Sequence, residues 1–434
     1  MSMFTGFQNR RLPLEAGFLA VLLLVLAASI WNFTKSIPFQ LVDFDSFQYL
    51  AFSRSLLSGT EIYIPEIRSP FLALLIPSSL LWARFLMALF HVGTTLLIYL
   101  ISRRLFENRA AALFAALAFG LSWWMFVFQT SPLSDLPGMF FFLAGLLFWL
   151  GGEKRGQLVS GVLFGLALLV RFDLIFLIAP LVFFTRPQHF WRVLLPAFLL
   201  AGPFEFLLDA LAYGHLVYSP FEFFRVNVLQ FGGTASKDFL RVGVLLARTF
   251  PLIVFLALFA ILRFQKRGNR ILLSLFVPFF LLASYAEPAE PRIFVVKLMP
   301  LLALLSANFF LVLKETSMKR EVWQAVTAGL LIFVVGFGLL RLAGIQYEER
   351  KFEVEDCVSG RVCSNFYSAV EYYCGVHTQL VQPTLESVGE LGKTCDSFVY
   401  FKDISFYDTN VNTYLQQHAE LWGENTAAYV YRFR

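Results

Sequence analysis

Charged side chains are scarce in this sequence. Only 15% of its 434 residues are Asp, Glu, Lys or Arg, against about 25% in ordinary soluble domains. Apolar residues make up 58% of the chain, with 52 Phe among them, and the mean hydropathy is +0.67. This composition excludes a soluble enzyme.

Familiar catalytic signatures are absent as well. The sequence contains no Walker loop, no His-Glu-x-x-His and no Gly-x-Ser-x-Gly pattern. Nucleotide, zincin and serine-hydrolase chemistry therefore have no support. No segment repeats with a period of about 20–50 residues, which excludes solenoids.

Cysteine is rare, and all four cysteines lie in the C-terminal tail. An even number in a short segment outside the membrane predicts disulfides, with three pairings possible. Zinc is the alternative, because Cys374 and His377 have ligand-like spacing, although the other spacings fit no zinc pattern. The disulfide candidates are Cys357, Cys363, Cys374 and Cys395.

Long apolar runs take the place of these missing features. Runs of about 20 residues can cross the ~30 Å hydrocarbon layer as helices. The sequence predicts an α-helical polytopic membrane protein with about eleven spans, at roughly 14–33, 83–102, 110–128, 136–150, 157–170, 174–185, 193–213, 242–262, 271–285, 293–313 and 322–342. The apolar run within 70–82 is too short to cross, so we interpret it as a re-entrant piece or as the outer end of the second span.

The loops between these spans alternate in basic content. One group of short loops carries sixteen Lys and Arg residues, and the opposite group carries eight, mixed with acids. The positive-inside rule then predicts a cytoplasmic N-terminus and an extracytoplasmic C-terminus. Short cytoplasmic loops favour a bacterial inner membrane, or the endoplasmic reticulum membrane in a eukaryote.

The tail differs from the rest in charge. From Gly344 onward there are 7 Lys/Arg and 13 Asp/Glu, so the tail carries −6 and the preceding part +11. The basic excess belongs to loops at the membrane, and no nucleic-acid partner is implied. We predict a membrane domain over 1–343 and a small extracytoplasmic α/β domain over 344–434. Its expected strands lie at Phe398–Phe401 and Tyr429–Phe433, with a helix over Val411–Leu421.

Charged residues gather at the predicted outer ends of the spans. Placing a charge at membrane depth costs about 2.5–3.5 kcal/mol, so this grouping needs a reason. Arginine binds phosphate oxygens through its planar fork, and a carboxylate can take a proton from an acceptor hydroxyl. The candidates are Asp43, Asp45, Arg68, Asp135, Arg171, Asp173, Glu290 and Arg292.

The segment from Asp45 to Gly59, DSFQYLAFSRSLLSG, followed by Ile67-Arg-Ser-Pro70, resembles the first outer loop of the GT-C membrane glycosyltransferases. That family includes protein O-mannosyltransferases and the lipid A aminoarabinose transferase. The resemblance continues through Ser134-Asp-Leu-Pro137, Gly161 to Arg171, and Glu290-Pro-Arg292 with Met299-Pro300. It covers roughly residues 41–313.

This resemblance implies inverting transfer of a sugar from a polyprenyl-phosphate donor to a glycan, lipid or protein acceptor on the outer side. It also implies that Asp45 is the general base, with Asp43 as the substitute. Arg68, Asp135, Arg171, Asp173, Glu290 and Arg292 then bind donor or substrate. No metal site is assigned. Ser46 stands where many members have a second acid, which weakens a metal proposal, although a divalent metal stays open.

Simpler interpretations stand beside these. Asp43 and Asp45 could cap a helix expected over 45–57, and the arginines could anchor at the membrane interface among lipids. Asp173 and Glu290 could pair with neighbouring arginines. Two other functions also remain: a transporter or flippase for a lipid-linked anionic sugar, and a membrane scaffold.

Overall fold

The computed structural model describes residues 16–37, 44–58, 69–215, 218–225, 239–285, 291–316, 319–347, 360–365, 367–374, 376–381, 390–402, 408–424 and 428–433. The chain divides into two compact units. Unit 1 comprises Met1–Phe33, Met87–Gln129 and Ser134–Ile345, and unit 2 comprises Thr34–Leu86, Thr130–Leu133 and Gln346–Arg434.

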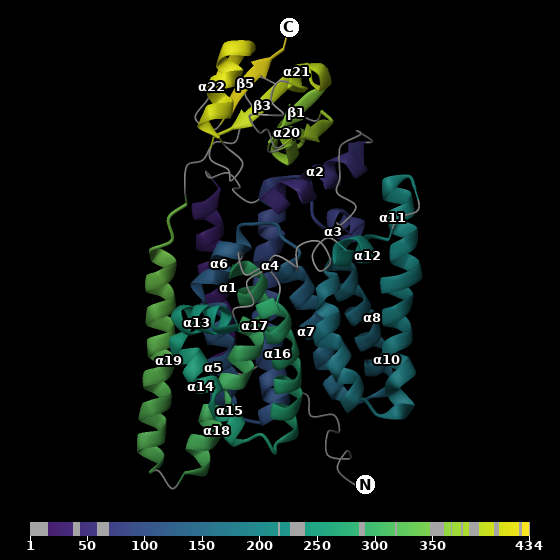
Figure 1. The fold of residues 1–434 in the computed structure, drawn as a ribbon. Helices are drawn as coiled ribbons and strands as arrows, with labels where there is room; N and C mark the ends of the chain where they lie inside the picture. Colours follow the sequence, from purple (N-terminus) through teal and green to yellow (C-terminus); the bar gives the residue numbers. More distant parts are fainter. Residues whose placement is uncertain are drawn as a thin grey trace. The chain divides into compact units, whose positions relative to one another are not determined.

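Unit 1 is a bundle of helices that run side by side (Figure 1). Helices α1 (Ala16–Ser36) and α4 (Leu80–Phe106) have their larger parts in it. The others are α5 (Arg109–Gly120), α6 (Trp123–Gln129), α7 (Asp135–Gly151), α8 (Lys154–Val170), η2 (Phe172–Leu174), α9 (Ile175–Ile178), η3 (Ala179–Phe184), α10 (Pro187–Leu199), η4 (Leu200–Phe204), α11 (Glu205–Tyr213), α12 (Ser219–Phe224), α13 (Phe239–Thr249), α14 (Pro251–Ala257), α15 (Phe259–Leu262), α16 (Arg267–Tyr285), α17 (Pro291–Ser306), α18 (Asn308–Glu315) and α19 (Arg320–Ala343).

Local sequence explains where these helices begin and end. Glu107 has φ 51°, which ends α4, and the Asn108 side chain accepts a hydrogen bond from Ala111 N and starts α5. Gly152, with φ 73°, ends α7 because glycine adopts the left-handed region without strain. Arg171 is extended and ends α8.

Each predicted span coincides with a helix or a series of short helices. In the described part of the chain, five helices are long and apolar enough to cross a membrane. A sixth span is added if α5 and α6, bent by 51°, count as one. Several other predicted spans correspond to shorter or broken helices, so the expected number of eleven stays a prediction.

Among the described residues of the first third of the chain, two whole helices belong to unit 2. Helix α2 (Phe44–Ser58) matches the helix expected over 45–57. The short apolar run after Ser69 forms a separate helix, α3 (Pro70–Leu75), whose start is capped by the Ser69 hydroxyl. Ser53 donates a hydrogen bond to the Ile76 carbonyl at 2.7 Å, which ties α2 to the end of α3.

The tail forms a five-stranded sheet in the order β2-β1-β3-β5-β4. Its strands are β1 (Val362–Ser364), β2 (Thr378–Leu380), β3 (Ser397–Phe401), β4 (Glu420–Glu424) and β5 (Ala428–Arg432). β1 pairs in parallel with β2 and β3, and β5 pairs antiparallel with β3 and β4.

In the described part of the tail, three short helices accompany the sheet: α20 (Tyr367–Cys374), α21 (Leu391–Thr394) and α22 (Thr409–His418). The two predicted strands match β3 and β5, but the predicted helix is too long at its end. Residues from Glu420 onward form β4 instead, because they pair with the edge of β5.

A disulfide joins β1 to the segment before β3 in the tail core. It links Cys363 and Cys395, both buried beside Phe398 and Tyr431. Cys374 is disulfide-bonded as well, so its sulfur is not available for the zinc alternative. Cys357 lies outside the described residues.

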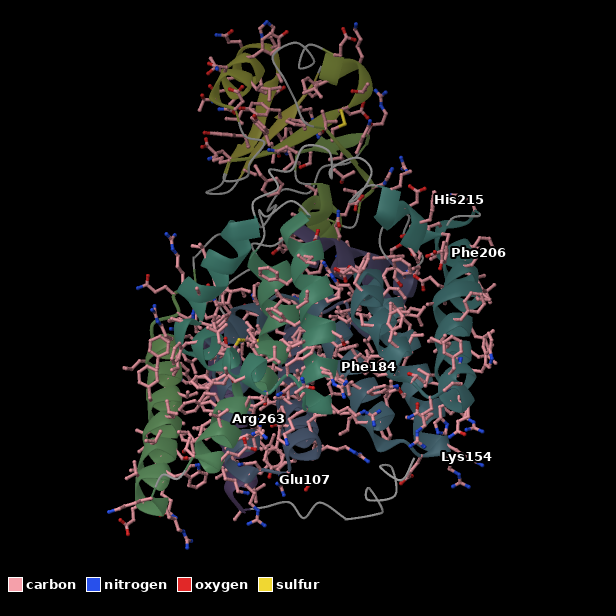
Figure 2. The ribbon with its side chains drawn as sticks, turned by 60° about the horizontal axis from the view of Figure 1, so that its bottom comes forward. Glu107, Lys154, Phe184, Phe206, His215 and Arg263 are labelled. Carbon is pink, nitrogen blue, oxygen red and sulfur yellow. A yellow bond between two sulfur atoms is a disulfide. The ribbon has the colours of Figure 1, made fainter. Side chains whose placement is uncertain are left out.

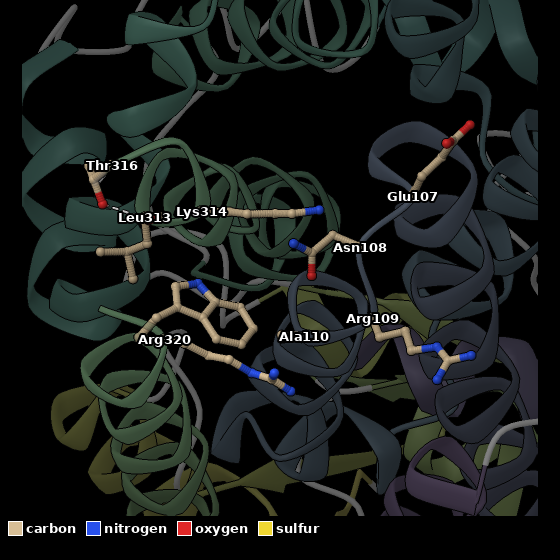
Figure 3. Close-up of a pocket in the computed structure, with 9 residues that line it drawn as sticks. Glu107, Asn108, Arg109, Ala110, Leu313, Lys314, Thr316 and Arg320 are labelled. Atoms are coloured by element: carbon tan, nitrogen blue, oxygen red, sulfur yellow. Dashed lines mark hydrogen bonds between the residues drawn. The ribbon is translucent and has the colours of Figure 1, made fainter. Parts of the chain in front are cut away.

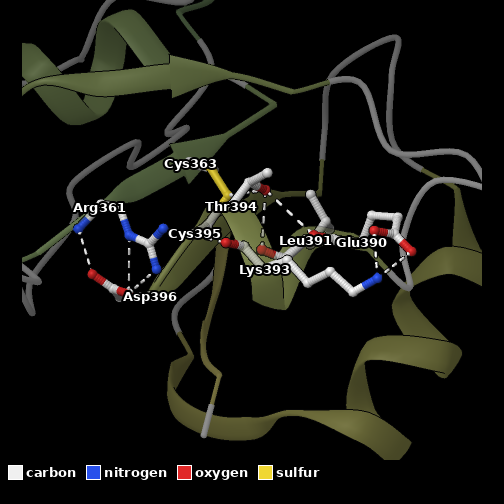
Figure 4. Close-up of polar contacts among 8 residues, drawn as sticks. All are labelled: Arg361, Cys363, Glu390, Leu391, Lys393, Thr394, Cys395 and Asp396. Carbon is white, nitrogen blue, oxygen red and sulfur yellow. Dashed lines mark hydrogen bonds and ion pairs between the residues drawn. A yellow bond between two sulfur atoms is a disulfide. The ribbon is translucent and has the colours of Figure 1, made fainter.

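An exposed ion pair lies next to this disulfide (Figure 4). The Arg361 guanidinium donates to Asp396 Oδ1 at 2.9 Å, and the Arg361 backbone N–H donates to Oδ2 at 2.8 Å. The hydrogen bond from the Arg361 side chain lowers the pKa of Asp396 below its usual value.

Candidate functional site

Four charged side chains meet inside unit 1: Asp135, Arg171, Asp173 and Lys297. We call them the charge cluster. Arg171 Nη1 lies 3.2 Å from Asp135 Oδ2, and Arg171 Nε lies 3.3 Å from Asp173 Oδ1. Lys297 Nζ lies 3.3 Å from Asp135 Oδ1 and also bonds Asp173 Oδ2. Two cations are thus shared between two carboxylates.

Helix ends bring these groups together. Asp135 is the first residue of α7, and Arg171 follows the last residue of α8. Asp173 lies in η2, the single turn that leads on to α9. Lys297 is the seventh of the sixteen residues of α17. The cluster therefore joins three segments that are far apart in sequence.

Burial makes the pairing obligatory. Lys297 is 0% exposed and Asp135 1%, so water does little to stabilise either charge. An unpaired charge in such a place costs several kcal/mol. Arg171 also donates to the Ser134 hydroxyl at 2.8 Å, which fixes its guanidinium plane. These four charges sum to zero.

The structure brings three predicted site residues together, Asp135, Arg171 and Asp173. It adds Lys297, which the sequence analysis missed. The available signal was a lysine inside the predicted span 293–313, because an ionisable residue within an apolar run is a functional-site candidate.

Four of the other predicted site residues lie wholly or partly outside the described part of the chain. Arg292 is the second residue of α17, but its side chain lies outside the described part, as do the whole of Asp43, Arg68 and Glu290. No geometry is therefore assigned to those side chains.

Asp45 belongs to unit 2, in the first turn of α2. Its side chain is partly exposed, whereas the next residues, Ser46 and Phe47, are fully buried. The amino end of a helix favours a negative charge, because its backbone N–H groups point outward there. Asp45 is thus a carboxylate held on an ordered, partly open helix end.

Helix α20 of the tail supports α2. The Phe47 ring lies 5.7 Å from the Tyr372 ring and 5.8 Å from the Tyr373 ring, measured between centroids. Arg54 donates to the Tyr372 carbonyl at 2.7 Å. The orientation of the helix that carries Asp45 therefore depends on packing against the tail.

Part of the chain is similar to a known protein family. Residues 70–203 match the family model of dolichyl-phosphate-mannose-protein mannosyltransferases. The curated proteins include no significant sequence match.

Similar solved structures cover nearly the whole chain. The structure of ArnT from Cupriavidus metallidurans bound to undecaprenyl phosphate is similar over 96% of this chain and 98% of that one, with a TM-score of 0.67 and 15% identity. The apo structure of the same protein gives a TM-score of 0.62 and 14% identity over the same shares.

The oligosaccharyltransferase of Archaeoglobus fulgidus, tethered to an acceptor peptide, is similar at a TM-score of 0.56 and 12% identity. The match covers 88% of this chain and 69% of that one. At these identities the likeness establishes the fold. The family model adds a match over residues 70–203, which is less than a third of the 434 residues. The chain therefore has the fold of these membrane-protein structures and, over that segment, is similar to dolichyl-phosphate-mannose-protein mannosyltransferases.

Proposed function

We propose that this protein transfers a sugar from a polyprenyl-phosphate donor to an acceptor at the extracytoplasmic face of the membrane. The observation that carries the proposal is the fold likeness to a structure bound to undecaprenyl phosphate, which spans 96% of this chain. The position of Asp45, on a partly open helix end, supplies the base that such a reaction requires.

The proposed reaction needs one proton acceptor. Asp45 takes the proton of the acceptor hydroxyl as the hydroxyl oxygen attacks the anomeric carbon. The bond between that carbon and the donor phosphate breaks, and the polyprenyl phosphate leaves with the electron pair. A phosphate needs no general acid to leave. Attack from the opposite side inverts the anomeric centre, and Asp43 is the substitute base.

The donor phosphate needs a cation to bind it. The charge cluster holds in place the helix that carries one candidate, Arg292. Lys297 anchors α17 through Asp135 and Asp173. Arg292 lies five residues earlier on the same helix, so the cluster fixes the helix that carries it. We propose that Arg292 and Arg68 contact the phosphate, while Asp135, Arg171, Asp173 and Glu290 order the donor site.

The location of the cluster favours a transferase over a flippase. Charges near the middle of long membrane helices mark transport pathways. Here Asp135 begins α7, and Arg171 directly follows α8. Three of the four charged groups therefore lie at helix ends, and Lys297 meets them from within α17.

We further propose that the N-terminus is cytoplasmic and the tail extracytoplasmic, in a bacterial inner membrane. The uneven distribution of Lys and Arg between alternate loops supports this orientation. The donor is a co-substrate, and no further cofactor is assigned. A divalent metal is the alternative, and retention of transfer after chelation with EDTA tests it.

The test of the proposal is transfer by wild type and Asp45→Asn. We expect the variant to lose transfer by about 100- to 10,000-fold, which is the usual contribution of a positioned base. Asp408→Asn is the matched control. Asp408 caps α22 by accepting from Asn410 N, and Asn caps a helix equally well. Undiminished transfer by folded Asp45→Asn would contradict the assignment.

A further inference from the structure

A cavity of about 420 Å³ opens in unit 1 between the α4–α5 corner and the α18–α19 corner (Figure 3). Cavities of roughly 300–1,000 Å³ are typical of ligand sites. It lies at the end of the helices opposite the charge cluster. Lys297 and Lys314 are 17 residues apart along α17 and α18, which is about 26 Å at the helical rise.

Positive charge dominates the cavity wall. Arg109, Lys314 and Arg320 line it, against the single acid Glu107. Lys314 and Arg320 make no ion pair with any residue in the described ranges. The neighbouring acid, Glu315, is held by Arg263 at 2.7 Å, so it does not neutralise them. The wall therefore carries a net charge of about +2.

An indole N–H and two helix amino ends also face this part of unit 1. Trp323, which also lines the cavity, has a buried indole N–H with no partner among the described residues. A buried N–H without a partner is unfavourable, so an acceptor at this position would be stabilised. The cavity is also bordered by the amino ends of two long helices, α5 and α19. These ends add positive potential on the same side.

The surroundings favour a lipid over a free ion. Helix α19 supplies Arg320 and Trp323. Only 17% of its most apolar stretch is buried against the rest of the chain. Its apolar side chains remain open, with Ile332 71% exposed and Leu340 74% exposed. Acyl chains can lie along this helix while a phosphate occupies the cavity at its start.

We propose that this cavity binds the phosphate headgroup of an anionic phospholipid, at the end of the unit 1 helices opposite the charge cluster. Lys314 and Arg320 hold the phosphate, and the Trp323 indole N–H donates to it. The group that the cavity recognises is a phosphate with one negative charge, either free or as a diester. The source is the membrane lipid itself, since α19 offers the apolar surface for its chains.

The test measures lipid retention by native mass spectrometry of the full-length protein in detergent, titrated with phosphatidylglycerol or phosphatidylcholine. The double variant Lys314→Gln/Arg320→Gln should bind phosphatidylglycerol about 25-fold more weakly than wild type, at roughly fivefold per lost cation. Its binding of phosphatidylcholine should change little.

The matched control is Lys154→Gln/Arg155→Gln. It removes the same charges from an exposed start of α8, at the end of unit 1 where Figure 2 also shows Glu107 and Arg263. Equal loss of phosphatidylglycerol in both double variants, or loss in neither, would overturn the proposal.

A second arm separates the two sources of phosphate. Inorganic phosphate is titrated without lipid, and stabilisation is read from thermal unfolding of wild type and Lys314→Gln/Arg320→Gln. We expect no stabilisation at millimolar phosphate. If phosphate alone stabilised wild type but not the variant, the ligand would be the free ion and the lipid assignment would be wrong.

Discussion

A single ammonium group, that of Lys297, connects two helices to a third. It contacts Asp135 at the start of α7 and Asp173 after α8, while its own helix is α17. Among the described side chains, substitution by Met leaves the two carboxylates with one cation, Arg171. Loss of one partner of a buried pair costs about 3–5 kcal/mol. We therefore expect Lys297→Met to lower the thermal unfolding temperature clearly.

The double variant Lys297→Met/Asp173→Asn keeps the cluster neutral, so it should be more stable than Lys297→Met alone. Lys154→Met, at an exposed site, is the control for loss of a lysine. Unfolding temperatures in one detergent provide the measurement. An unchanged temperature for Lys297→Met would contradict the structural role given to this residue.

The ion pair between Arg361 and Asp396 predicts a pH dependence in the tail. The pKa of Asp396 is lowered in the folded chain by its bonds to Arg361. Its stabilising effect is therefore complete above the ordinary Asp pKa of about 3.9, and it is lost as the pH falls through the lower folded pKa. Asp396→Asn should speed hydrogen exchange in β1 and β3 at pH 7, and the difference should shrink near pH 2.5.

The control for that measurement is Glu390→Gln, whose acid pairs with Lys393 on the surface of the same segment (Figure 4). Both variants remove one exposed carboxylate, but only Asp396 also accepts a backbone N–H, from Arg361. Equal exchange rates in the two variants at pH 7 would show that the Arg361 pair does not hold the strands.

Close helix packing sets the stability of the bundle at the scale of elements. A Cβ at Gly338 of α19 would lie 2.7 Å from the Leu121 carbonyl oxygen, just after α5. Gly338→Ala must push the two segments apart, at a cost of about 1–3 kcal/mol. Gly336, on the same helix, has nothing within 4 Å of that position.

Gly336→Ala should therefore be neutral or stabilising by up to about 1 kcal/mol, because Ala is the better helix former. Thermal unfolding of the two variants measures the difference. A pair of variants with equal unfolding temperatures would mean that α19 does not pack closely against the end of α5.

The contact between α2 and α20 predicts that the tail affects catalysis. Phe47 is fully buried and packs against both the Tyr372 and the Tyr373 ring. Removal of such a ring costs about 3–5 kcal/mol of packing, which loosens the helix that carries Asp45. We expect Phe47→Ala to reduce kcat for transfer with a smaller effect on donor KM.

Leu57→Ala is the matched control on the same helix, since Leu57 is 75% exposed. It should keep the wild-type rate. If Phe47→Ala folded and transferred sugar at the wild-type rate, the packing of α2 on α20 would have no role in holding the proposed base.

At the scale of the whole molecule, the sequence was sufficient to predict what depends on local pattern. The apolar runs marked the helices, and the short strand-like runs Phe398–Phe401 and Tyr429–Phe433 marked β3 and β5. The apolar segment after Asp45 marked α2. Each of these signals lies within a single stretch of chain.

Contacts between residues far apart in the sequence could not be predicted from local patterns. Lys297 meets Asp173 from 124 residues away, and no local pattern encodes that distance. The partner of Cys363 was one of three possibilities, and the sheet decides it by pairing β1 beside β3. The same limit explains why the helix predicted over Val411–Leu421 extends too far, past His418. Residues from Glu420 onward form β4 through pairing with β5, which lies later in the chain.

The most direct test of the central claim follows both products of one reaction. Purified full-length protein is incubated with polyprenyl-phosphate donors carrying different labelled sugars, together with extracted membrane acceptors. The account predicts that one donor gives labelled acceptor and free polyprenyl phosphate in equal amounts, with the anomeric configuration inverted. If folded protein bound these donors but released no polyprenyl phosphate from any of them, the protein would not be the glycosyltransferase proposed here.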